Sequence, residues 1–310
     1  MNLVKSLIIL LVIAVIGIFA SVHFAPFETA SYLVDIKRNI AGLERKTISL
    51  ADGNQYVYLE GGKGETLVLL HGFGADKDNF TEVSPYLTGD FHVIAPDHIG
   101  FGESSKPTGA DYSPIAQAQR LHELVARLGL ERFHLGGSSM GGHIAMTYAT
   151  LYPHEVKSLW LLDPGGVWSA PEAEMRTIIR KTGVNPLTAK TPEEFRKVFD
   201  IVMSKPPFIP GFVLDEMAKK RIANFDLEQN IFAQLSADNV EERVRGLTTP
   251  TLLVWGAEDR VLNPEAAPIL EGLLTNVKTI IMPGIGHLPM LEAPKQTATD
   301  LKAFIADLPE

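Results

Sequence analysis

The sequence predicts an α/β protein built on a mostly parallel, doubly wound sheet of eight strands. Short strand-like segments, most of them apolar, alternate with helical segments, as at Thr66–Leu70, Phe133–Leu135, Ser158–Leu162 and Val277–Met282. Continuous apolar runs are typical of parallel strands buried on both faces, and their alternation with helices is typical of strand-helix-strand units. In such sheets, ligands bind beyond the carboxyl ends of the strands.

The composition fits one large domain with an insertion. The chain has 310 residues, 45% of them apolar, and a formal net charge of −9. The acidic balance, without a basic stripe, argues against a nucleic-acid partner. The sequence has no cysteine, and its nine histidines lack metal-ligand spacing. We therefore expect neither a metal nor an organic cofactor.

The N-terminal 46 residues are expected to lie outside the catalytic domain. Leu7–Val22 is apolar and uncharged and would span about 24 Å as a helix. Because Ile18–Ala20 matches a cleavage site poorly, residues 1–27 are interpreted as an uncleaved membrane anchor. The alternative is a signal segment whose removal leaves a secreted or periplasmic protein. Residues 28–46 are expected to form an amphipathic linker helix, on the membrane or docked on the domain.

The first half of the domain begins with a hairpin, in which Asp52-Gly53 joins strands at 46–50 and 55–60. The buried strand 66–70 then runs into His71-Gly72-Phe73. A helix is expected at 79–87, a strand at 91–95 and a helix at 113–128. Asp97 and Glu103 are expected to brace loops, and His71 to hold the loop that contains it.

The turn after the strand at residue 133 carries the first chemical motif. Gly137-Ser138-Ser139-Met140-Gly141 fits the pattern Gly-x-Ser-x-Gly with Ser139 at its centre. Small residues on both sides of such a turn let the chains pass closely and push the serine out at a helix N-terminus. The unpaired amides there favour negative charge, as a serine nucleophile requires. The alternative is a structural loop before a helix that runs from about Ser139 to Tyr152.

The strand-helix alternation stops after the strand at 158–162. Residues from about 167 to 244 read as several helices without a strand, and Thr191-Pro192 begins one of them. We expect a helical cap over the site, or alternatively a subdomain without substrate contact.

The second half supplies two further polar residues just after strands. Asp259 follows the predicted strand 249–255, and His287 follows the strand 277–282; helices are expected at 264–274 and 292–307. The chain order Ser139, Asp259, His287 on alternating strands and helices is typical of a hydrolase triad. Asp163, which also ends a strand, is the alternative acid, and His143 is expected to be packed rather than to act as the base.

These motifs together resemble the α/β-hydrolase family over roughly Thr47–Leu308. Within that family the chain is similar to small bacterial membrane-associated lipases and to membrane-anchored monoacylglycerol lipases. The segments that carry the resemblance are His71–Phe80, Gly137–Gly142, Val254–Gly256, Asp259–Leu262 and Gly286-His287 with Glu292. The expected domain therefore covers residues 47–310, with a cap at about 167–244.

The resemblance implies a serine-dependent carboxylic ester hydrolase that acts on acylglycerols or related acyl esters. Ser139 would be the nucleophile, His287 the base and Asp259 the residue that orients His287. The backbone N–H groups of Phe73 and Met140 would form the oxyanion hole. Two alternatives remain: a carbon–carbon bond hydrolase of ring-cleavage products, and a catalytically silent hydrolase-fold binding protein.

Overall fold

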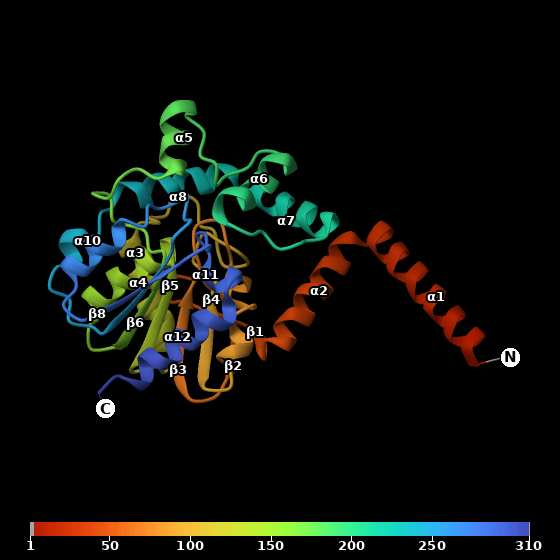
Figure 1. Cartoon of the computed structure of the whole chain (residues 1–310), viewed down its shortest axis with the longest axis horizontal. Helices are drawn as coiled ribbons and strands as arrows, with labels where there is room; N and C mark the ends of the chain where they lie inside the picture. Colours follow the sequence, from red (N-terminus) through yellow and green to blue (C-terminus); the bar gives the residue numbers. More distant parts are fainter. Residues whose placement is uncertain (1–2, 310) are drawn as a thin grey trace.

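The fold is a single eight-stranded sheet with helices on both faces (Figure 1), seen in a computed structural model that describes residues 3–309. The strands are β1 Leu43–Ser49, β2 Gln55–Gly62, β3 Glu65–Leu70, β4 Phe91–Pro96, β5 Phe133–Ser138, β6 Val156–Leu162, β7 Thr251–Gly256 and β8 Val277–Met282. Their order is β1-β2-β4-β3-β5-β6-β7-β8. Strand β2 is antiparallel to β1 and β4, and the other neighbouring pairs are parallel. The predicted mostly parallel, eight-stranded sheet is confirmed.

The central strands are apolar on both faces because each face contacts its own core. In β3, Val68 and Leu70 belong to one apolar cluster, whereas Leu67 and Leu69 belong to the cluster on the other face. All four side chains are at most 1% exposed. Burying a side chain of this size contributes about 1.5–3 kcal/mol. The alternation explains why the buried strands lack a polar face in the sequence.

Helices α3 (Pro114–Arg127), α4 (Met140–Leu151) and α10 (Ala266–Leu273) supply side chains to the first cluster. Helix α12 (Pro294–Ala306) and the 3-10 helix η1 (Lys77–Phe80) supply them to the second. Sheet strands are thus covered on both sides, as expected for a doubly wound arrangement.

One predicted helix is corrected by a proline. The stretch 79–87 contains two short 3-10 helices, η1 and η2 (Ser84–Tyr86), instead of one α-helix. Pro85 lacks the N–H that an α-helix would need at that position. The last predicted helix, 292–307, is confirmed as α12, which begins at Pro294; a separate short helix, α11 (Pro289–Glu292), precedes it.

Local signals for turns and helix starts are confirmed. In the hairpin between β1 and β2, Gly53 has φ of 85°, and the Asn54 N–H donates to Asp52 Oδ1 at 2.9 Å. Thr191 caps α6 (Pro192–Val202) by accepting the Glu194 N–H at 3.2 Å. Such a cap contributes about 1 kcal/mol.

Five helices follow one another between β6 and β7. They are α5 Glu174–Thr182, α6, α7 Gly211–Ala223, α8 Phe225–Ala237 and α9 Glu241–Val244. Figure 1 shows α5 to α8, coloured green to teal, gathered on the side of the sheet away from the C-terminus. Small apolar clusters of their own hold them together, for example Phe195 with Ala218.

The N-terminal residues form two helices, α1 (Leu3–Phe24) and α2 (Pro26–Ile40), which extend from the sheet as an arm in Figure 1. The expectation of a transmembrane helix is corrected: among the helices of residues 3–309, none combines the length and the apolar character needed to cross a membrane. The first two residues of the segment 1–27 lie outside the described residues.

The predicted linker helix 28–46 is also partly wrong. Helix α2 ends at Ile40, and Leu43–Lys46 already belong to β1. Gly42, with φ of 69°, takes the left-handed conformation that commonly follows a helix end and turns the chain into the strand. Helix α2 contacts β1 and α7.

Candidate active site

Ser139 occupies a strained position between strand β5 and helix α4. Its φ of 54° and ψ of −115° lie outside the backbone regions that residues other than glycine normally adopt. Such strain costs about 1–3 kcal/mol. A Cβ atom on Gly137 would lie 2.3 Å from the Gly141 carbonyl oxygen, and one on Gly141 would lie 2.1 Å from the Leu70 oxygen. The two glycines are therefore required for the turn that exposes Ser139.

The loop after β3 approaches Ser139 from the neighbouring strand. A Cβ atom on Gly72 would lie 3.2 Å from Ser139 Cβ, so the backbone of this loop runs directly beside the serine. The next residue, Phe73, packs its ring 5.4 Å from that of Phe232 in α8. On the other side, Met140 is the first residue of α4, and the N–H of a first helical residue has no acceptor within its own helix.

Asp259 and His287 form a buried pair in the loops after β7 and β8. His287 Nδ1 lies 2.7 Å from Asp259 Oδ2, which also accepts the Trp255 Nε1–H at 3.1 Å. Asp259 Oδ1 accepts the backbone N–H groups of Val261 and Leu262 at 2.8 and 3.0 Å. An ionised carboxylate can accept hydrogen bonds but cannot donate them. The proton of His287 therefore resides on Nδ1, which leaves Nε2 as an acceptor.

A cavity of about 310 Å³ is lined by three of the predicted site residues: Ser139, Phe73 and Met140. Val261 and Leu262, whose N–H groups bind Asp259, line the same cavity. No hydrogen bond joins Ser139 to His287 among those formed within residues 3–309.

The rest of the cavity wall is mostly apolar and comes largely from the inserted helices. Its apolar residues include Met175, Ile179, Leu187, Phe232 and Leu235. Two arginines of α5 line it as well: Arg180 pairs with Glu172 at 3.2 Å, whereas Arg176 lies 4.3 Å from the centre of the Trp168 ring. Within the described chain, Arg176 forms no ion pair.

Asp163, at the end of β6, lies next to the Asp259–His287 pair. One side-chain atom from each of the three residues falls within 4.8 Å of the other two. Carboxylate oxygens and an imidazole nitrogen are atoms that can bind a metal cation. Protein donors, however, already compensate the charge of Asp259, and one of them is His287 itself. We therefore describe the group as a buried polar cluster and not as a cation site.

Comparison with known proteins agrees with this geometry. A family model for the alpha/beta hydrolase fold matches residues 65–199. Lipase 1 of Psychrobacter immobilis is 42% identical over 94% of this chain and 93% of its own length. The monoacylglycerol lipase ABHD6 of Mus musculus is 30% identical over 80% of this chain and 77% of its own. The chain belongs to the α/β-hydrolase family. A solved structure, that of a membrane phospholipase A, is 37% identical and covers 97% of this chain and 98% of its own, with a TM-score of 0.89.

The similarity to these relatives shows that this α/β-hydrolase is a carboxylic ester hydrolase of the lipase and esterase group. The expected family and the expected class of enzyme are confirmed. His143 is packed in this hydrolase, fully buried on α4, with Nε2 2.7 Å from Asp238 Oδ1.

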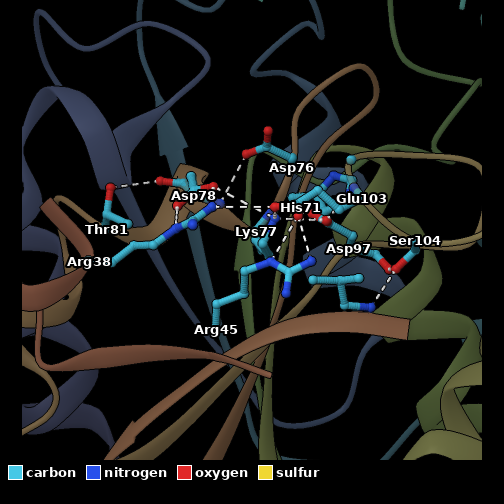
Figure 2. Close-up of polar contacts among 12 residues, drawn as sticks. Arg38, Arg45, His71, Asp76, Lys77, Asp78, Thr81, Asp97, Glu103 and Ser104 are labelled. Atoms are coloured by element: carbon cyan, nitrogen blue, oxygen red, sulfur yellow. Dashed lines mark hydrogen bonds and ion pairs between the residues drawn. The ribbon is translucent and has the colours of Figure 1, made fainter. Parts of the chain in front are cut away.

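A buried lysine that the sequence analysis did not single out supports the loop carrying Phe73 (Figure 2). Lys77 is 1% exposed, and its Nζ donates to Asp97 Oδ2 at 3.0 Å and to Glu103 Oε1 at 2.7 Å. The Lys77 N–H also donates to Asp97 Oδ1 at 2.7 Å. Asp97 and Glu103 were expected to brace loops, and here they hold η1 against the loop after β4.

Two arginines from the N-terminal part of the hydrolase extend this network. Arg38 of α2 binds Asp78 through two parallel hydrogen bonds of 2.7 and 2.6 Å, and Arg45 of β1 binds Glu103 at 2.8 Å. Figure 2 shows both arginines facing the acidic residues around Lys77. The only sequence signal for this cluster is the run Asp76-Lys77-Asp78 after a glycine-rich loop, which is also common on exposed surfaces.

His71 is held neutral at the base of the same loop. Its Nδ1 lies 2.8 Å from the Gly72 carbonyl oxygen, to which it must donate, and its Nε2 accepts the His98 N–H at 3.1 Å. A second proton on Nε2 would face that N–H donor. Burial lowers the pKa of His71 to about 4.

We therefore expect the hydrolase to lose stability as the pH falls from about 6.5 toward 4. In this window the unfolded chain protonates residue 71, whereas the folded chain does not. The unfolded state then binds more protons, and the free energy of unfolding falls by on the order of 3 kcal/mol. Urea unfolding midpoints at pH 7 and 5 should show a smaller pH effect for His71→Asn than for the wild type.

His154→Asn provides the matched control, because His154 is exposed. That variant should show the same pH effect as the wild type. An equal pH effect in His71→Asn and in the wild type would contradict the assignment.

Proposed function

We propose that this chain hydrolyses acyl esters of glycerol through Ser139, His287 and Asp259. The observation that carries the proposal is the strained Ser139, which faces an apolar cavity whose wall residues Val261 and Leu262 bind the acid of a buried His–Asp pair. Ser139 Oγ attacks the ester carbonyl, and His287 Nε2 accepts the hydroxyl proton. His287 then delivers this proton to the leaving alcohol, and water hydrolyses the acyl-enzyme by the same steps.

Asp259 acts in this proposal by fixing the imidazole of His287. Its Oδ2 accepts the Nδ1–H at 2.7 Å, which leaves Nε2 unprotonated and stabilises the imidazolium formed during attack. The three other donors on Asp259 hold the carboxylate in this orientation.

The developing oxyanion is proposed to bind the backbone N–H groups of Phe73 and Met140. The close approach of Gly72 to Ser139 and the position of Met140 at the start of α4 support this assignment. Backbone donors at a helix start stabilise negative charge without having to reorganise.

The inserted helices are proposed to act as a cap, at about residues 167–244 of a hydrolase domain that covers 47–310. The apolar residues of α5 and α8 that line the cavity support this division. They offer an acyl chain a water-excluding surface, which is the property that favours lipid-like esters over small polar ones.

One observation favours a second candidate, the hydrolysis of a carbon–carbon bond in a ring-cleavage product. Substrates of that kind carry a carboxylate, and Arg176 is a cation at the cavity without a carboxylate partner among the described residues. The largely apolar wall and the lipase relatives favour the ester substrate.

The test combines turnover with covalent labelling. Rates are measured for a series of p-nitrophenyl esters of increasing chain length, for monoacylglycerols and triacylglycerols, and for a ring-cleavage dienoate. A fluorophosphonate probe followed by peptide mass spectrometry identifies the nucleophile. We expect ester turnover and a label on Ser139, and an unchanged label in Ser138→Ala.

Two results would contradict the proposal. One is folded protein that neither turns over any ester nor labels at Ser139, which would favour a silent binding protein. The other is a higher kcat/KM for the dienoate than for every ester.

A further inference from the structure

Asp163 is fully buried at the end of β6, in an unusual backbone conformation. Its φ is 46°, which is rare for a residue with a side chain, and aspartate is among the few types that tolerate it. Asp163 Oδ1 accepts the Gly256 N–H at 2.8 Å. Asp163 Oδ2 is buried without a hydrogen-bond donor in the described chain.

Asp163 is close to a second carboxyl group. A carboxyl oxygen of Asp163 lies within 4.8 Å of one from Asp259 and of a ring nitrogen of His287. Asp259 has four protein donors, one of them His287 itself, whereas Asp163 has one. Two ionised carboxylates at this separation, away from water, repel each other strongly. Asp259, which has more hydrogen-bond donors, retains the negative charge.

We propose that Asp163 is a neutral carboxylic acid that donates a hydrogen bond from Oδ2 to Asp259 and acts as a positioning residue for the Asp259–His287 pair. The proposal rests on the function proposed above, in which His287 is the base. The hydrogen bond holds the carboxylate of Asp259 and withdraws part of its charge from His287.

The other charged group near Asp163 is consistent with this assignment. Glu292 of α11 faces the cluster, but its two carboxylate oxygens accept the N–H groups of Gly286, Ser204 and Lys205. Among the described residues, no lysine or arginine forms an ion pair with Asp163. Burial and the charge of Asp259 both raise the pKa of Asp163 well above its usual value.

Removing the proposed donor should change how easily His287 is protonated. Without it, the negative charge of Asp259 acts more fully on His287 and stabilises the imidazolium form. In Asp163→Ala, the acid limb of kcat/KM should therefore move to higher pH by about one unit. In Asp163→Asn the amide N–H replaces the acid as the donor, so activity should stay within about threefold of wild type, with a smaller shift. Glu258→Gln is the control, because Glu258 is exposed beside Asp259 and its removal should leave the profile unchanged.

A spectroscopic measurement tests the protonation state independently of turnover. The infrared spectrum of folded protein at neutral pH should contain the C=O band of a protonated, buried carboxylic acid. That band should be absent from Asp163→Asn and present in Glu258→Gln. This measurement also decides the question if Asp163→Ala does not fold.

Two outcomes would overturn the inference. The first is that the band is missing from folded wild-type protein. The second is that Asp163→Asn loses about 10⁴-fold in kcat while Asp259→Asn stays active, which would make Asp163 the ionised partner of His287. If instead the band is found but esters are not turned over and Ser139 is not labelled, only the proposed function fails.

Discussion

Replacing Ser139 with alanine is expected to lower kcat for a p-nitrophenyl ester by about 10⁴-fold or more. The physical reason is that the proposed covalent route requires the hydroxyl, and Ser139 Oγ forms no hydrogen bond to a described residue that its loss would break. The variant should therefore keep its fold, as checked by circular dichroism, and should no longer react with a fluorophosphonate.

The neighbouring hydroxyl provides the control. Ser138 is fully buried, and its Oγ has no partner among residues 3–309, so Ser138→Ala should retain most of the activity. A further comparison tests whether the residues act as a unit: Ser139→Ala combined with His287→Ala should be scarcely slower than either single variant. Additive losses in the double variant would mean that the two residues contribute separately.

Replacing Lys77 with methionine is expected to have the largest effect on stability, lowering the free energy of unfolding by about 3–5 kcal/mol. The substitution leaves Asp97, which is fully buried, without its ammonium partner. It also removes one of the three cations that contact Glu103. Urea unfolding midpoints of the variant and the wild type provide the measurement. Ester turnover should fall as well, because the loop that carries Phe73 leads directly into η1.

Lys63→Met is the matched control, since Lys63 is exposed and should tolerate the change. Adding Asp97→Asn to Lys77→Met should recover part of the lost stability, because the unpaired buried charge is removed. If Lys77→Met is no less stable than Lys63→Met, the buried ion pair does not stabilise the loop.

Much of the fold could be predicted from the sequence because its signals are local. The hairpin at Asp52-Gly53 depends on a residue type that tolerates a positive φ, and the strand Thr66–Leu70 depends on a continuous apolar run. The strained turn at Ser139 is encoded within five residues. Each of these signals is read from neighbours along the chain, so no knowledge of distant contacts is needed.

The errors occur where the sequence supplies competing local signals. Residues 28–46 have helical spacing throughout, yet Gly42 ends the helix, and pairing with β2 converts Leu43–Lys46 into a strand. Residues 79–87 are predicted to form one helix, but Pro85 and poor helix formers such as Asn79 and Thr81 limit them to short 3-10 helices.

The sequence by itself determined the α/β class, the eight strands and the candidate residues Ser139, Asp259 and His287, because each follows a strand in a recognisable turn. Only the tertiary structure decided that Lys77 is buried among Asp97 and Glu103, and that Asp163 lies beside Asp259. The physical reason is that the energy of a buried charge depends on partners brought from distant parts of the chain, such as the segments that contain Arg38 and Arg45. Sequence spacing contains no measure of those distances.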